Sequence, residues 1–315
     1  MKERRGWAIL RSCLALLMLA LLCCTSTQAD LSEAPPEGET EGPPVLVEER
    51  DLVYANVEGK ELRLDLIYPE KSADPLPLVI FIHGSEHSFY MANRINLYHA
   101  TMEAAKRGYL AANISYRTTL EKSGGKSKYE FPAQVHDAKC AVRWIKANAG
   151  RYGIDVNRVG LVGTSSGGCL ALLLGLTDEE DGLEGECGDM SISTAVQAVV
   201  NVAGEADAVM QYAVSYTYYK PWLGGGPDSV PDRYRAASPI TYVSADDPPV
   251  LTIMGGEDAR CPQVELLDSR LREAGVPHTL IVIPGVSHYL ENIIDFTQDG
   301  PVWEFLDLHL HGGGD

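Results

Sequence analysis

Residues 159–175 read VGLVGTSSGGCLALLLG, and this segment carries the strongest structural signal in the sequence. A short apolar run leads into glycines around a pair of serines, and a second apolar run of helical length follows. This order predicts a strand, a sharp turn and a helix. Residues 163–167 fit Gly-x-Ser-x-Gly, a pattern in which the central serine lies on a strained turn with its hydroxyl above the sheet. Ser165 is therefore the candidate nucleophile.

The composition is that of an ordinary globular protein, with 45% hydrophobic and 22% charged residues among 315. The length suits one large α/β domain or two small ones; the sequence shows no internal repeat, and we expect one domain. The formal net charge of −18 argues against nucleic acid or an anionic membrane surface as a partner. It favours neutral or cationic substrates and also keeps a protein soluble outside the cell.

Residues 1–29 have the pattern of a secretory signal peptide. A basic start precedes the apolar residues 13–24, and residues 27–29 fit a small-residue cleavage site. The apolar segment is shorter than the roughly 20 residues that a spanning helix needs. A lipoprotein signal at Cys23 or Cys24 is the alternative, but a bulky residue precedes each cysteine. We expect a secreted or periplasmic protein, with lipid anchoring disfavoured and no integral membrane span in the mature protein.

Residues 30–44 are rich in Pro, Glu and Gly and have few large apolar side chains. Such a segment cannot bury enough apolar surface to fold, so it is expected to be a disordered linker. The folded domain is expected over residues 45–315.

Four cysteines lie beyond the signal peptide and permit three pairings, among which the sequence does not choose. They are Cys140, Cys169, Cys187 and Cys261. No Cys-x-x-Cys occurs, and the terminal pair His309 and His311 has no third ligand nearby, so neither a metal nor a cofactor site is predicted.

Apolar runs alternate with helical stripes along the domain, which predicts a mostly parallel central sheet with helices on both faces. Strands are expected over residues 78–82, 109–115, 196–203, 249–254 and 279–283, and helices over 95–107, 133–149, 263–274 and 290–310. Residues 205–238 are rich in Tyr and are too long for a simple crossover. They are expected to form a small lid insertion over the site, or to pack their aromatic side chains onto the core, and the sequence favours neither.

Acyl transfer by a serine needs a base, a carboxylate that orients the base, and donors for the oxyanion. His288 is the candidate base and Asp258 the candidate acid, because each follows a predicted strand and such loops meet at one edge of a parallel sheet. Glu257 is the rival of Asp258, but neighbours in a tight turn point apart. The chain order Ser165, Asp258, His288 is the one associated with the α/β-hydrolase arrangement.

With these residues in place, the sequence resembles the α/β-hydrolase superfamily. Within it, the resemblance is to the esterase branch of BD-FAE-type feruloyl and acetylxylan esterases, carboxylesterases and hormone-sensitive-lipase relatives. It extends over about residues 50–310. The motifs that carry it are residues 64–69, 81–84, 116–117, 137–144, 152–155 with 157–158, 163–168, 237–239, 247–249, 255–258 with 262, and 285–288.

The resemblance implies that Ser165 is the nucleophile, Asp258 the acid partner and His288 the base. It also implies an oxyanion hole with one donor at the backbone N–H of Ser166 and another from the loop after residue 84. That second donor would be Ser85 or Glu86, where the family commonly has glycine.

The activity implied by the resemblance is that of a secreted serine esterase without metal or cofactor. It would cleave small carboxylic esters, free or attached to a polysaccharide as acetyl or feruloyl groups, through an acyl-enzyme. Two other functions stay open. One is an exopeptidase of the prolyl-oligopeptidase kind, which usually adds an N-terminal propeller domain that these residues are too few to build. The other is a weakly catalytic, ligand-binding homologue.

Overall fold

Strand β3, Leu76–Ile82, shows how the core is built, because every one of its residues is buried. Leu78, Ile80 and Ile82 belong to one hydrophobic cluster, whereas Val79 and Phe81 belong to a second. Successive side chains of a strand point to opposite faces of its sheet. The continuous apolar run therefore reflects a strand that is covered on both sides.

A computed structural model describes residues 43–84, 93–119, 121–288, 295–296 and 298–312. Within it, residues 43–315 form one compact unit. The predicted signal peptide, nearly all of the predicted linker, and Ser85 and Glu86 lie outside the described residues.

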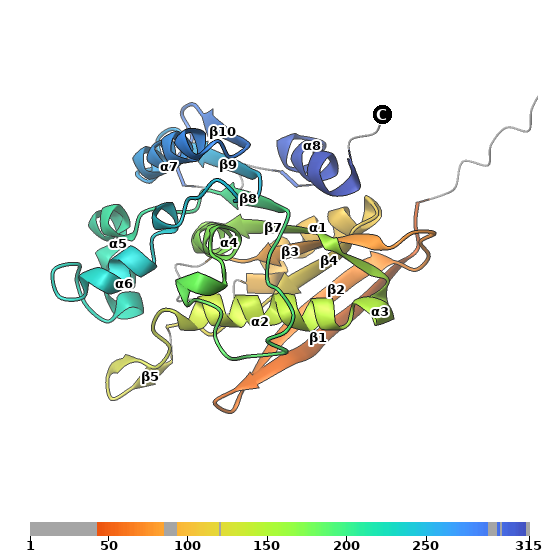
Figure 1. Cartoon of the computed structure of the whole chain (residues 1–315), viewed down its shortest axis with the longest axis horizontal. Helices are drawn as coiled ribbons and strands as arrows, with labels where there is room; N and C mark the ends of the chain where they lie inside the picture. Colours follow the sequence, from red (N-terminus) through yellow and green to blue (C-terminus); the bar gives the residue numbers. More distant parts are fainter. Residues whose placement is uncertain (1–42, 85–92, 120, 289–294, 297, 313–315) are drawn as a thin grey trace, which may run out of the picture. The chain divides into compact units, whose positions relative to one another are not determined.

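Apart from a short hairpin, the described strands form one eight-stranded sheet in the order β1-β2-β4-β3-β7-β8-β9-β10 (Figure 1). The β1–β2 and β2–β4 pairs are antiparallel, and all the other neighbours are parallel. A mostly parallel sheet was predicted and is confirmed. The strands are β1 Leu46–Val57, β2 Lys60–Pro69, β3, β4 Leu110–Ile114, β7 Ile154–Thr164, β8 Ala198–Val202, β9 Val250–Gly255 and β10 His278–Ile283, beside a separate hairpin of β5 Lys122–Ser123 and β6 Lys126–Ser127.

Helices cover both faces of this sheet, as predicted. Side chains of α2, α4, α5 and α6 join the first cluster, those of α1 and α8 join the second, and α7 contributes to both. The helices are α1 Asn93–Lys106, α2 Ala133–Ala147, α3 Ala149–Tyr152, α4 Ser166–Leu176, α5 Ala208–Leu223, α6 Pro231–Ala236, α7 Cys261–Ala274 and α8 Pro301–Leu306, followed by a π-helical turn Asp307–Gly312. Within the described part of the chain, no helix has the length and apolar character needed to cross a membrane.

The continuous final helix expected over residues 290–310 is wrong. Residues 295, 296 and 298–300 are not helical, and α8 begins at Pro301; residues 289–294 lie outside the described part. The reason is the Gly300-Pro301 step. A proline is accepted in the first turn of a helix but disfavours helical backbone at the residue before it. Gly300 is accordingly extended, with φ of 171°.

The insertion over residues 205–238 folds into α5 and α6, and most of its aromatic side chains pack inward. Tyr219, Trp222 and Tyr234 are fully buried in the first cluster. The indole of Trp222 donates to Gln134 Oε1 on α2 at 2.9 Å and meets Phe131 edge to face. Tyr216, in contrast, is 61% exposed, and Tyr218 is half-buried. Packing onto the core therefore accounts for the positions of Tyr219, Trp222 and Tyr234.

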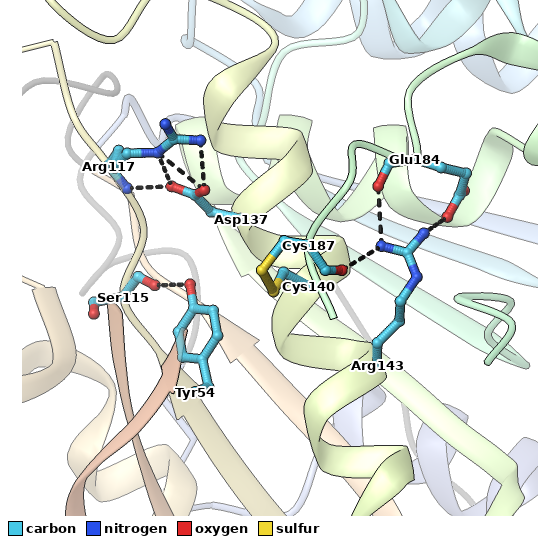
Figure 2. Close-up of a disulfide and its surroundings, with 8 residues drawn as sticks. All are labelled: Tyr54, Ser115, Arg117, Asp137, Cys140, Arg143, Glu184 and Cys187. Atoms are coloured by element: carbon cyan, nitrogen blue, oxygen red, sulfur yellow. Dashed lines mark hydrogen bonds and ion pairs between the residues drawn. A yellow bond between two sulfur atoms is a disulfide. The ribbon is translucent and has the colours of Figure 1, made fainter. Parts of the chain in front are cut away.

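A disulfide joins Cys140 on α2 to Cys187, while Cys169 and Cys261 are buried free thiols. Figure 2 shows this bridge next to Arg143, whose guanidinium contacts Glu184. Glu184 also binds Lys139, a second α2 cation, and Thr194 donates to its carboxylate at 3.0 Å. The disulfide and these ion pairs together fasten residues 184–187 to α2.

Candidate active site

The predicted strand, sharp turn and helix around Ser165 are present. Strand β7 ends at Thr164 and α4 begins at Ser166. Ser165 between them has φ of 54° and ψ of −127°. A non-glycine residue with positive φ is strained and persists only where its surroundings hold it. Here its N–H donates to Val202 O at 2.8 Å and its carbonyl accepts from Gly168 N at 2.7 Å.

Glycine is required on both sides of this turn because backbone of the turn itself and of the end of β3 passes too close for a side chain. A Cβ on Gly163 would lie 2.0 Å from Gly167 O. A Cβ on Gly167 would lie 2.2 Å from Ile82 O at the end of β3. The Gly-x-Ser-x-Gly spacing is therefore a packing requirement as well as a conformational one.

Three side chains from three separate loops meet at this turn. Ser165 Oγ lies 2.9 Å from His288 Nε2, and His288 Nδ1 lies 2.5 Å from Asp258 Oδ2. Ser165 follows β7, Asp258 follows β9, and His288 follows β10. These strands are parallel, so their carboxyl ends lie at one edge of the sheet, as the sequence predicted. The rival Glu257 is exposed and makes no contact with the imidazole among those described.

Burial differs among the three side chains in a way that suits proton transfer. Asp258 is 4% exposed and Ser165 is 6% exposed, whereas the His288 side chain is 32% exposed. Burial acts to raise the pKa of Asp258, but hydrogen bonds from His288 and from the Arg260 N–H outweigh it and hold the pKa below its usual value. Asp258 is therefore a carboxylate at neutral pH.

The charge of Asp258 fixes the tautomer of His288. A carboxylate can only accept hydrogen bonds, so His288 Nδ1 carries the proton and donates to Asp258. Nε2 is then left with a lone pair facing the Ser165 hydroxyl. The arrangement can remove a proton from Ser165 Oγ and return it later to a leaving group.

Gly84, the last described residue before the loop expected to complete the oxyanion hole, lies directly beside the nucleophile. A Cβ on Gly84 would lie 2.7 Å from Thr164 O and 2.9 Å from Ser165 Cβ. The preceding His83 stacks on the ring of Tyr116 at 4.3 Å, and the Tyr116 hydroxyl donates to His83 O at 2.9 Å. Ser85 and Glu86 lie outside the described residues, so the second donor stays a prediction. The first, Ser166, is buried in the first turn of α4.

The Tyr116-Arg117 motif is anchored from α2. Arg117 donates to Asp137 through Nε at 2.9 Å and Nη2 at 2.8 Å, and its backbone N–H donates to the same carboxylate at 2.8 Å (Figure 2). Asp137 and Arg117 are both buried. This pair holds the segment that carries Tyr116, and so supports His83 and Gly84 beside Ser165.

Two other histidines that the structure describes, His278 and His136, have different surroundings. His278 Nε2 lies 3.1 Å from Asp268 Oδ1, and its Nδ1 lies 2.8 Å from Val276 O. His136 lies on α2, where burial lowers its pKa. The described residues hold no group of three or more His, Cys, Asp and Glu side chains arranged to bind a metal ion.

Sequence reasoning missed two buried charged residues beside the candidate acid, Arg260 and Glu205. Arg260 donates through Nη1 to Asp258 Oδ1 at 3.3 Å, and Glu205 Oε2 lies 3.9 Å from Arg260 Nε. An arginine two residues after the candidate acid was a visible signal. Glu205, which follows β8, had none that set it apart from a surface carboxylate.

Comparison with known proteins agrees with this geometry. Residues 64–271, about two thirds of the chain, match the model of the BD-FAE family. The esterase LipC of Mycobacterium tuberculosis is 28% identical over 245 residues, which cover 75% of this chain and 58% of LipC. The chain thus spans little more than half the length of that relative. An ethyl acetate hydrolase of Pseudomonas putida is 27% identical over 279 residues, 82% of each chain.

Solved structures give the same picture. A truncated carbohydrate esterase from gut microbiota superposes with a TM-score of 0.71 at 26% identity, over 85% of this chain and 95% of that one. The resemblance read from the sequence motifs is thereby confirmed. The chain has the α/β-hydrolase fold and belongs to the BD-FAE family.

Proposed function

We propose that this protein is a serine hydrolase that cleaves carboxylic esters through an acyl-enzyme on Ser165. The observation that carries the proposal is the hydrogen-bonded line from Ser165 Oγ through His288 to Asp258, with distances of 2.9 and 2.5 Å. Membership of the BD-FAE family and the esterase names of its relatives support it.

The geometry suggests the following chemistry. Ser165 Oγ attacks the ester carbonyl while His288 Nε2 takes its proton, and Asp258 stabilises the imidazolium that forms. The negative oxygen of the tetrahedral intermediate would accept from the Ser166 N–H. The C–O bond to the alcohol breaks as His288 returns the proton to the leaving oxygen. Water then repeats the sequence, releasing the acid and restoring the free hydroxyl of Ser165.

The substrate class that we propose is an acetyl or feruloyl ester on a polysaccharide, met outside the cytoplasm. The name of the carbohydrate esterase that shares the fold supports the first part. The predicted signal peptide supports the second, and so does the Cys140–Cys187 disulfide, because disulfides persist in oxidising compartments. Release of acetate or ferulate from acylated xylan tests the substrate. Recovery of the protein from the periplasm or medium, lacking its first 29 residues, tests the export.

A fluorophosphonate probe tests the reaction itself. Wild-type protein should be labelled on Ser165, and Ser165→Ala should be blank and lose at least about 10⁴-fold in kcat on a p-nitrophenyl ester. Ser191→Ala is a matched control, because Ser191 is exposed and lies in the segment between α4 and β8, 26 residues after Ser165 in the sequence. Equal labelling of wild type and Ser165→Ala would refute the proposal. Faster turnover of an amino-acid anilide than of the ester would favour the exopeptidase alternative.

A further inference from the structure

Both carboxylate oxygens of the candidate acid, Asp258, have hydrogen-bond partners. Asp258 Oδ2 faces His288, while Asp258 Oδ1 accepts from the Arg260 backbone N–H at 3.0 Å and from Arg260 Nη1 at 3.3 Å. Arg260 is 5% exposed, so its charged guanidinium group is buried inside the protein. The oxygen that the imidazole does not use is therefore the one that Arg260 holds.

Arg260 is itself held by a second buried carboxylate. Glu205 Oε2 lies 3.9 Å from Arg260 Nε, a charge attraction at a distance beyond that of a hydrogen bond. Glu205 is 2% exposed, and its Oε1 accepts from the Tyr219 hydroxyl at 2.6 Å. Burial and the neighbouring Glu205 charge raise the pKa of Tyr219 well above its usual value, so this hydroxyl stays protonated and donates.

These contacts join three separate segments. Asp258 and Arg260 lie between β9 and α7, Glu205 lies after β8, and Tyr219 lies on α5 of the insertion. A buried arginine is tolerated only when its charge is paired and its N–H groups are bonded. The network therefore ties the position of the acid to the packing of the insertion.

We propose that Arg260 is a positioning residue, which fixes the Asp258 carboxylate with Oδ2 toward His288, and that Glu205 and Tyr219 fix Arg260. This inference rests on the proposed function. The acid works by holding the imidazole in the right tautomer and orientation, so a carboxylate that is free to rotate would lower turnover without weakening substrate binding.

The charge of Arg260 should also show in the pH profile. Among the described residues, the charged and titratable groups that interact with it are Asp258 from its own segment, Glu205 after β8 and Tyr219 on α5, and Asp258 in turn contacts His288. Removing the cation favours the protonated form of the coupled Asp258–His288 pair, so the pair loses its proton at a higher pH. The acidic limb of kcat/KM should then move upward by about 0.5 to 1 pH unit.

The test compares Arg260→Met, which keeps the length of the side chain, with Arg260→Lys, which keeps the charge. Titration with the fluorophosphonate probe counts competent sites, so that kcat refers to folded enzyme. Arg260→Met should lose about 10- to 100-fold in kcat, with KM changed by less than about twofold and the acidic limb moved upward. Arg260→Lys should restore the limb and part of kcat. Arg272→Met is the control, because Arg272 is 68% exposed on α7.

Two results would overturn the inference. A raised KM with unchanged kcat in Arg260→Met would mean that the guanidinium touches substrate, and an unmoved acidic limb would mean that its role is only structural. If Arg260→Met does not fold, Glu205→Gln and Tyr219→Phe take its place. Each should lower kcat about 3- to 10-fold with KM unchanged, and wild-type values in both would refute the network.

A spectroscopic readout separates this inference from the proposed function. The proton on His288 Nδ1, in a short bond to a carboxylate, should give a far-downfield NMR signal in wild type. That signal should move upfield in Arg260→Met and stay in place in Arg272→Met. If wild type cleaves no ester but the signal moves, the proposed function fails and the positioning inference stands. If esters are cleaved and the signal stays in place, the inference alone fails.

Discussion

Replacing Glu184 with glutamine should destabilise the protein by about 3 kcal/mol. Glu184 is the shared counterion of Lys139 and Arg143, whose side chains are 0% and 2% exposed. Removing one partner of a buried ion pair costs about 3 to 5 kcal/mol, because the other charge is left uncompensated. The two pairs share one carboxylate, so their costs do not add.

Other acceptors place the expected loss at the lower end of that range. Lys139 Nζ lies 3.4 Å from Thr177 O, and Arg143 Nη1 donates to the carbonyls of Glu184 and Cys187 at 3.0 and 3.2 Å. These contacts survive the substitution. A loss of about 3 kcal/mol is still a large part of the 5 to 15 kcal/mol that usually separates folded and unfolded protein.

Urea unfolding followed by tryptophan fluorescence measures this loss, with the disulfide kept oxidised. With an m value of about 3 kcal/mol per molar, the midpoint for Glu184→Gln should fall by about 1 M. Glu186→Gln is the matched control: Glu186 lies in the same segment and is exposed, so its midpoint should stay within about 0.2 M of wild type. A Glu184→Gln midpoint equal to that of the control would refute the reasoning about the buried cations.

Two further predictions concern stability. Burial raises the pKa of Asp247 to about 6, above its unfolded value of about 3.9, so wild type loses stability as pH rises through this window whereas Asp247→Asn does not. Between pH 4 and pH 7, the free energy of unfolding of the variant should rise by about 1 kcal/mol relative to that of wild type, as measured by denaturation at both pH values. This is roughly half the full linkage value, because the side chain is partly exposed. No such rise would contradict the assigned burial. Replacing Cys140 and Cys187 with serine opens a loop of 47 residues and should cost about 4 kcal/mol, seen as a lower melting temperature that reductant no longer changes. A melting temperature equal to that of oxidised wild type would argue against the bridge.

The central strands and the turn at Ser165 could be predicted because local pattern and burial agree there. A run such as Leu78–Ile82 is apolar at every position only if both faces of its sheet are covered, and the two clusters that divide its side chains show this. The meeting of Ser165, Asp258 and His288 followed from topology, since each residue lies in the loop after a parallel strand. Their separation in sequence did not matter.

What the sequence could not provide depended on contacts between distant segments. Four cysteines permit three pairings, and only the packing of residues 184–187 against α2 brings Cys187 to Cys140. Glu205 resembles a surface carboxylate until β8 and α5 enclose it against Arg260. The prediction of a continuous final helix was wrong for a local reason. Its apolar spacing continues across the Gly300-Pro301 step, where the backbone departs from helix.

The crowding around the nucleophile limits how this protein could be altered by directed evolution. Main chain from β3, β7, α4 and the loop after β8 meets there at glycines, and a methyl group on Gly168 or Gly204 would fall within 2.3 Å of Asn201 Oδ1. Most variants in a library that randomises these positions would not fold, because the added side chains would clash with their surroundings. New substrate preferences would have to be sought in side chains outside the glycine frame under Ser165.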